Sequence, residues 1–131
     1  MKLNFNDPNP GVFFPFNDDN PDAGGVCLRV LPMDELKRIE KATTKKRIEY
    51  KKGQRFEVLT VDNELKERLV FDYMITDWPG LTEDNGDPIE CDADNKVRAM
   101  NKFVKFANFV SSRMEMLEAD SMELKASAEK N

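Results

Sequence analysis

The chain has 131 residues, of which 40% are hydrophobic and 34% charged, and its net charge is −5. This length predicts a single domain, residues 1–131, with a modest core. Histidine is absent, which excludes histidine-based catalytic triads and histidine-ligated zinc sites. No apolar run is long enough to span a bilayer, and the first residues lack the apolar core of a secretion signal, so we expect a cytoplasmic protein with no membrane contact.

The first half of the chain, residues 11–60, is predicted to be the β-rich part. Strands are expected at residues 12–16 and 26–31, and Pro15 restricts the first of them to a sheet edge or a bulge. A short helix is expected at residues 33–42, because acidic residues open it and a lysine closes it.

A β-hairpin follows, with a predicted three-residue loop at residues 51–53 closed by Gly53. This loop places four apolar residues on one face, toward the core: Ile48, Tyr50, Phe56 and Val58. Residues 37–55 carry nine basic and two acidic side chains, a charge of +7, which leaves −12 on the remainder. Such a separation of charge indicates a surface that faces a partner or matches another part of the molecule.

The basic surface is formed by six residues of this hairpin: Lys45, Lys46, Arg47, Lys51, Lys52 and Arg55. Three interpretations remain open for it. The surface is solvated or docks against the acidic remainder or a neighbouring molecule, binds an acidic protein, or binds nucleic acid. Nucleic acid is disfavoured because Tyr50 and Phe56, the aromatic residues available for base stacking, are assigned to the core.

The second part of the chain, residues 61–125, is predicted to be helical. A helix over residues 64–76, capped by Asp62 or Asn63, precedes Trp78 and an acidic turn at residues 84–88. After a brief extended piece at residues 89–91, Asp92 caps a helix that reaches Met100, breaks near Asn101 and resumes from residue 102 to about residue 125. Together with the first half, this pattern predicts an α+β fold in which a small antiparallel sheet packs against three or four helices.

The termini are expected to carry little of the core. Residues 1–10 are rich in Asn, Asp and Pro and are predicted to be a flexible lead-in. Residues 126–131 are predicted to be a frayed tail, because they contain few apolar side chains.

The last helix has an apolar surface that is wider than a small core needs. Packing into the domain's own core is one explanation, and binding of a partner helix is the other. The hypothesis for the partner-facing surface names Phe103, Phe106, Phe109, Val110, Met114 and Met116.

No residue pattern predicts catalysis, a metal site or a cofactor. The acidic pairs lie in loops and at helix starts, where capping explains them. The acidic turn does not fit a calcium-binding loop, since Leu81 would stand at the first ligand position. The two cysteines, Cys27 and Cys91, are expected to be reduced and half-buried. We therefore expect a protein that is not an enzyme and holds no cofactor.

Several segments in chain order carry a family resemblance. They are GVFFPF at residues 11–16, VCLRVL, ATTKKRIEYKKGQRFE, a helix ending in ITDWPGL, and NGDPIECDADNK, and they span roughly residues 11–117. The chain resembles the bacteriophage tail assembly chaperones in these segments. The resemblance implies a non-enzymatic protein of the host bacterial cytoplasm that binds the tape-measure protein, helps recruit tail-tube subunits and is absent from the virion. It transfers no individual site residue.

Two other functions stay as alternatives. One is a structural tail or head–tail component retained in the virion, and the other is a nucleic-acid-binding regulator that uses the basic hairpin. Self-association also remains open.

Overall fold

The computed structural model describes residues 1, 3, 5–6 and 9–129, with side chains described up to residue 120. These residues form an α+β fold of four α-helices and two small antiparallel sheets, which confirms the predicted fold class. In chain order the elements are β1 (Val12–Pro15), a short 3-10 turn η1 (Pro21–Ala23), β2 (Gly25–Leu28), α1 (Met33–Thr43), β3 (Thr44–Lys51), β4 (Gln54–Val61), α2 (Asn63–Met74), β5 (Ile75–Asp77), α3 (Ala93–Lys102) and α4 (Val104–Glu129).

The three-stranded sheet has the order β1-β2-β5, and both of its pairings are antiparallel. Pro15 lies in the edge strand β1, as predicted, where its missing N–H leaves no interior ladder bond unmade. Strand β5 was not predicted, because the apolar pattern extended the preceding helix to residue 76. That helix ends at Met74 instead, and Ile75 pairs with Leu28. A β-branched residue suits this buried position on the second edge of β2.

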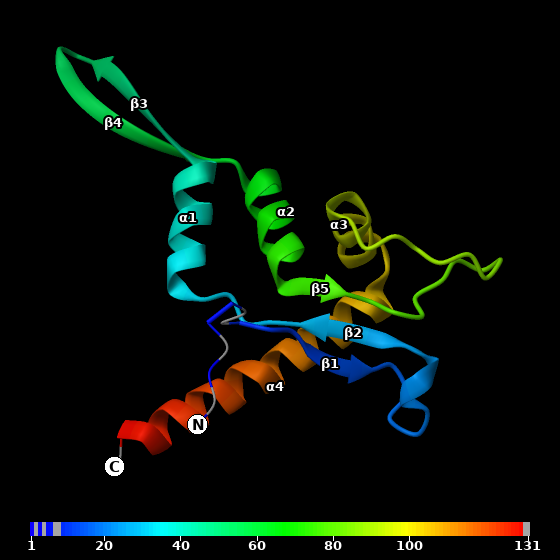
Figure 1. The fold of residues 1–131 in the computed structure, drawn as a ribbon. Helices are drawn as coiled ribbons and strands as arrows, with labels where there is room; N and C mark the ends of the chain where they lie inside the picture. The colour runs from blue at the N-terminus through cyan, green and yellow to red at the C-terminus, as the bar shows by residue number, and fades with distance from the viewer. Residues whose placement is uncertain (2, 4, 7–8, 130–131) are drawn as a thin grey trace.

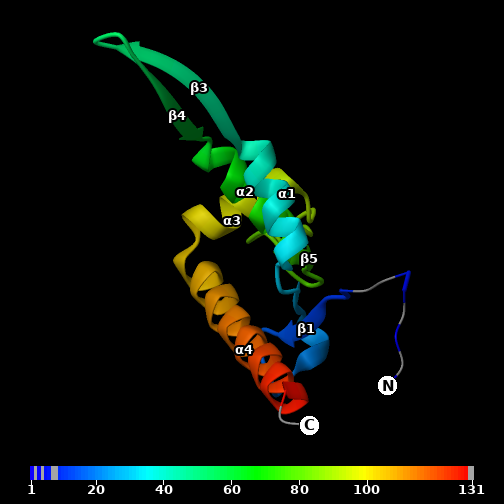
Figure 2. The ribbon, with the colours of Figure 1, turned by 90° about the vertical axis from the view of Figure 1, so that its left-hand side faces the viewer.

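The main core lies between this sheet and α4, which runs beneath the strands (Figure 1). Its buried members come from β2, from β5 and the residue after it, and from α4: Val26, Leu28, Ile75, Trp78, Val110 and Met114. Burial of such side chains stabilises a fold by about 1.5–3 kcal/mol each. Helices α1, α2 and α3 lie between the sheet and the β3–β4 hairpin, and the turned view shows α4 as a long rod along one side of the molecule (Figure 2).

The β3–β4 hairpin forms a separate two-stranded ribbon that projects from the ends of α1 and α2 (Figure 1). We call this ribbon, Thr44–Val61, the basic arm. Its base is closed by a hydrogen bond from the Asp62 N–H to the Thr43 carbonyl, 2.8 Å. The arm is not part of the sheet that covers the core, so the predicted inward-facing hairpin is wrong.

The turn of the arm also differs from the prediction. Its central residues are Lys52 and Gly53 alone, and both have positive φ, 51° and 76°, as a tight two-residue turn requires. The shorter turn pairs Ile48 with Glu57 and shifts the register by one residue. A shift of one residue moves a strand's side chains to the opposite face. Phe56 therefore lies on the face opposite Ile48 rather than beside it.

A close crossing of two loops fixes the segment after β5. Gly80 has a φ of 82°, and a Cβ there would lie 2.6 Å from the Ala23 carbonyl oxygen and 2.7 Å from the Gly24 Cα. The Gly25 N–H donates to the Pro79 carbonyl at 2.9 Å, so the two backbones are bonded as well as in contact. Only glycine at position 80 permits this approach.

The predictions for the termini fall partly outside the described residues. The residues outside the description are 2, 4, 7 and 8 of the lead-in and 130–131 of the tail. Within the lead-in, Asn9 donates hydrogen bonds to the Val30 carbonyl at 2.8 Å and to the Tyr73 hydroxyl at 3.0 Å. Helix α4 continues to Glu129.

Candidate functional site

The structure divides the six apolar residues predicted to face a partner into three pairs. Val110 and Met114 are buried in the core, so they do not present a surface in this conformation. Phe106 packs edge-on against Trp78, with ring centroids 5.7 Å apart. The Phe109 ring packs against the Phe16 ring, with ring centroids 5.3 Å apart. This contact explains why α4 carries an aromatic residue at position 109, outside its narrow apolar stripe.

The third pair, Phe103 and Met116, is exposed, and the two residues lie far apart along the chain. Phe103 stands at the junction of α3 and α4, where its backbone is extended and its N–H donates to the Ala99 carbonyl at 3.2 Å. Phe103 is 56% exposed, and the neighbouring Val104 is 72% exposed. The break predicted near Asn101 thus occurs two residues later, at an exposed aromatic side chain.

This junction borders an open cleft with a volume of about 540 Å³. We call it the corner cleft. Its apolar lining comes from the loop after Trp78, from α3 and from the start of α4: Leu81, Pro88, Ile89, Ala99, Phe103 and Phe106. Pockets of this size and apolar character hold small ligands or the anchor side chains of protein partners.

The far wall of the cleft is the acidic loop at residues 81–90, which folds back on itself. The Ile89 N–H donates to the Leu81 carbonyl at 3.0 Å, and the Glu83 N–H donates to the Asp87 carbonyl at 2.8 Å. The indole N–H of Trp78 donates to the Ile89 carbonyl at 2.8 Å, so the loop is bonded to the core tryptophan. The predicted reversal is therefore present. Thr82 and Pro88 form an isolated antiparallel β-bridge across it, and residues 89–91 form no named strand.

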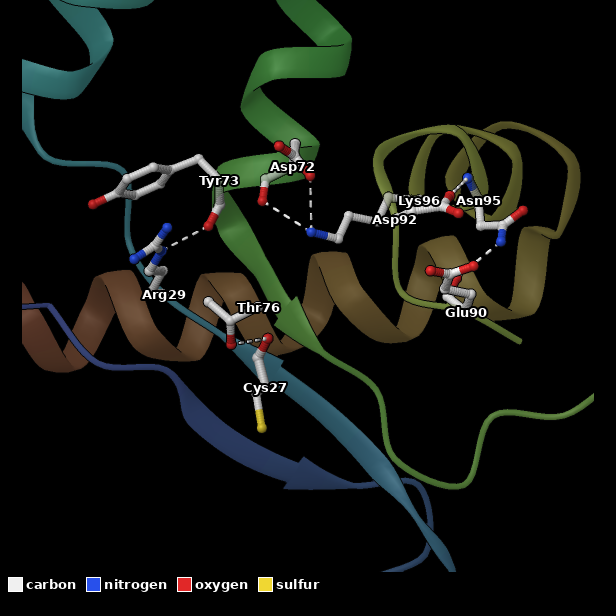
Figure 3. Close-up of polar contacts among 9 residues, drawn as sticks. All are labelled: Cys27, Arg29, Asp72, Tyr73, Thr76, Glu90, Asp92, Asn95 and Lys96. Carbon is white, nitrogen blue, oxygen red and sulfur yellow. Dashed lines mark hydrogen bonds and ion pairs between the residues drawn. The ribbon is translucent and has the colours of Figure 1, made fainter. Parts of the chain in front are cut away.

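Helix α3, the other wall, is held by polar contacts at its N-terminus (Figure 3). The Asp92 side chain accepts from the Asn95 N–H at 2.8 Å, as the predicted cap requires, and the Asn95 amide donates to the Glu90 carbonyl at 2.9 Å. The nearly buried ammonium of Lys96 donates to the Asp72 carbonyl at 3.1 Å and to its carboxylate at 3.0 Å. These contacts tie α3 to the end of α2 and position the cleft.

Charged groups of both signs surround the cleft opening. The carboxylates come from the loop and its end, Glu83, Asp84 and Glu90, and the cations come from the helices, Arg98 and Lys105. An apolar floor with a polar rim is the usual anatomy of a protein-binding site. The arrangement is suited to take an apolar side chain while the rim pairs with charges beside it.

The thiols and carboxylates of the described residues form no reactive or metal-binding group. Cys27 and Cys91 are free and half-buried, as expected. Burial raises the pKa of both thiols, and the nearby Asp77 carboxylate raises that of Cys27 further. Raised pKa values make cysteines less nucleophilic at neutral pH. Among the described residues no group of three Cys, Asp or Glu side chains is placed to hold a metal ion.

The six predicted basic residues all lie on the basic arm. The register places Lys46 and Arg55 on one face and Lys45, Arg47 and Lys51 on the other, while Lys52 is at the tip. The predicted residues therefore share one element, but they do not form one face.

Sequence reasoning missed the residues that complete the corner cleft. Leu81 and Ile89 bracket the acidic turn, and this apolar pair was the available signal for a loop closed at its base. Ala99 lies on the half-buried side of α3, and the sequence carries no signal that this side faces the loop at residues 81–90.

Comparison with known proteins finds no match for this chain among protein families, curated proteins or solved structures. No helix among the described residues has the length and apolar character needed to cross a membrane.

Proposed function

We propose that this protein is a non-enzymatic phage tail assembly chaperone that binds the tape-measure protein and aids tail-tube assembly in the host bacterial cytoplasm. The support from the sequence is the resemblance to the bacteriophage tail assembly chaperones, above all in the helix that ends in ITDWPGL and in the segment NGDPIECDADNK. These same segments build the loop wall of the corner cleft.

The corner cleft is the observation that carries the proposal. Phe103 and Val104 are exposed at its edge, and its floor is apolar. An amphipathic helix binds such a groove by inserting apolar side chains at helical spacing. The tape-measure proteins that bind the chaperones of the resembled family are long, apolar and helical, so a segment of one is a suitable occupant. Covering it keeps that segment from aggregating before the tail tube forms.

Co-expression with the tape-measure protein from the same gene cluster tests the proposal. We expect the tape measure to remain in the supernatant and to be recovered with this chain. Phe103→Ser removes the exposed aromatic ring from the cleft and is expected to reduce recovery at least about tenfold, which corresponds to roughly 1.4 kcal/mol. Met116→Ser is the matched control, because Met116 is also exposed but does not line the cleft.

Two results would contradict the proposal. One is a tape measure that is equally soluble and unbound without this chain. The other is detection of this chain in purified virions by mass spectrometry, which would favour a structural tail or head–tail component.

A further inference from the structure

The basic arm is a second surface, separate from the corner cleft. We propose that it binds an acidic, amphipathic polypeptide segment of a partner protein through an apolar row on one of its faces. That segment contacts the arm and not the corner cleft, whose lining residues all lie between positions 81 and 106.

The arm is not stabilised by packing against the rest of the molecule. It projects from the ends of α1 and α2, and both faces of its two strands are open in the two views (Figures 1 and 2). A two-stranded ribbon is only marginally stable by itself in water. Tight turn geometry at Lys52-Gly53 fixes its register, so the arm is a preformed element whose faces are uncovered.

One face of the arm carries a row of exposed apolar side chains. The register places Ile48 and Tyr50 of β3 on the same face as Leu59 and Val61 of β4. Tyr50 is 72% exposed and Leu59 is 67% exposed. An exposed cluster of large apolar residues marks a site of protein contact. Tyrosine also supplies much of the binding energy in such contacts.

The charge of the arm selects an acidic partner. Six basic and two acidic residues give it +4, whereas the rest of the chain, with 14 basic and 23 acidic residues, carries −9. Glu57 pairs with Lys46 at 3.0 Å and with Arg55 at 4.0 Å, and Glu49 pairs with Arg47 at 2.5 Å.

The other three cations, Lys45, Lys51 and Lys52, have no ion pair among the described residues. Charges more than about 8 Å apart are largely screened at physiological salt. Because the arm projects from the acidic body, an acidic segment is attracted to it with little repulsion from the remainder.

Nucleic acid fits the same charge but not the same face. A two-stranded ribbon is able to enter the major groove of DNA, where its cations contact phosphates. The apolar row would then lie in a strongly polar groove, with no apolar surface to cover it. A helical segment with an apolar stripe covers the row, and its flanking carboxylates face Lys46 and Arg55 on the same face. Lys52 at the tip and Lys45 and Lys51 on the opposite face add to the attraction.

Fluorescence anisotropy with labelled probes tests the inference. The probes are an amphipathic peptide of about 20 residues built from Leu and Glu, the same peptide with Lys in place of Glu, and a duplex DNA of similar length. We expect the intact chain to bind the Glu peptide more weakly as salt rises, and to bind the Lys peptide at least about tenfold less tightly.

Three variants locate the binding. The triple change Lys45→Glu, Lys51→Glu and Lys52→Glu turns the charge of the arm from +4 to −2 and is expected to reverse the preference between the peptides, while Lys102→Glu on α3 is the control for a charge reversal outside the arm. Tyr50→Ser with Leu59→Ser is expected to weaken Glu-peptide binding at least about tenfold without changing the salt dependence. In a third variant, residues 45–60 are replaced by Asn-Gly, which joins Thr44 to Val61 by a two-residue turn.

The body of the arm-less variant is expected to retain its far-UV circular dichroism, because the core and the Thr43–Asp62 bond are untouched. Failure to bind the Glu peptide, equal binding by the arm-less chain, or tighter binding of the duplex overturns the inference. The tape-measure experiment is separate. If the chain binds the Glu peptide but not the tape-measure protein, the chaperone role alone is refuted. If it binds the tape-measure protein but not the Glu peptide, the role of the arm alone is refuted.

Discussion

Replacement of Gly80 by alanine is expected to destabilise the fold strongly, and Gly86→Ala provides a matched control. Both glycines have positive φ, 82° and 90°. An alanine at such a φ costs about 1–2 kcal/mol at either position. At Gly86 no atom beyond the two neighbouring residues in the chain lies within 4 Å of the new Cβ, whereas at Gly80 the Cβ meets the Ala23 carbonyl oxygen at 2.6 Å.

The crowding at Gly80 adds to the conformational cost. The contacted atoms belong to the backbone, so no side chain is able to rotate away. Overpacking of this kind costs about 1–3 kcal/mol. The total is about 2–5 kcal/mol for Gly80→Ala against about 1–2 kcal/mol for Gly86→Ala. For a chain of this size each kcal/mol lowers Tm by about 4 °C.

Thermal unfolding followed by circular dichroism measures both variants. We expect Tm to fall by about 8–20 °C for Gly80→Ala and by about 4–8 °C for Gly86→Ala. Equal losses for the two variants would refute the reasoning, because the close loop crossing would then contribute nothing. Guanidinium denaturation with unchanged m-values would confirm that the same folded and unfolded states are compared.

Three further predictions follow from contacts elsewhere in the molecule. Lys96→Met removes the two ammonium hydrogen bonds at Asp72 and is expected to lower the free energy of unfolding by about 1.5–3 kcal/mol. Asp72→Asn keeps the bond to the carbonyl and changes a half-exposed side chain, so it is expected to cost under about 1 kcal/mol. The reverse order of the two variants in urea denaturation would contradict this assignment. Because Ile48 lies opposite Glu57, the double variant Ile48→Cys with Glu57→Cys is expected to form a disulfide on oxidation, and Ile48→Cys with Phe56→Cys is not. A disulfide in the second variant, detected by mass spectrometry, would contradict the two-residue turn and favour the three-residue one. Burial raises the pKa of the Cys27 and Cys91 thiols, so below that pKa a smaller fraction of each is thiolate than in the unfolded chain. Iodoacetamide is therefore expected to react more slowly with the native protein, at a rate that rises with pH. Equal rates for the native and unfolded chains would contradict this expectation.

Local signals in the sequence predicted much of the fold correctly. The Asp92 cap, the restriction of Pro15 to an edge strand and the reversal at Gly86 are each properties of one residue and its neighbours, and the structure has all three. Strand β5 was missed because Ile75 fits a helical stripe as well as a strand. Its pairing with Leu28, 47 positions earlier, is a tertiary contact that spacing does not reveal.

The hairpin shows why the candidate surfaces were harder to predict. Apolar alternation at Ile48 and Tyr50 suggested a buried face, but alternation alone does not say whether a core lies beneath it. The exposed position of Phe103 likewise depends on the angle between α3 and α4, and the same helical pattern places Val110 in the core. Periodicity identified the apolar residues, whereas tertiary arrangement decided which of them remain on the surface.

Hydrogen–deuterium exchange of the chain, alone and with the co-expressed tape-measure protein, tests the proposed role of the corner cleft most directly. Binding there predicts slower amide exchange in residues 81–90 and around Phe103 in the complex, with unchanged exchange in the sheet core. Unaltered exchange at these residues in a verified complex would contradict that role.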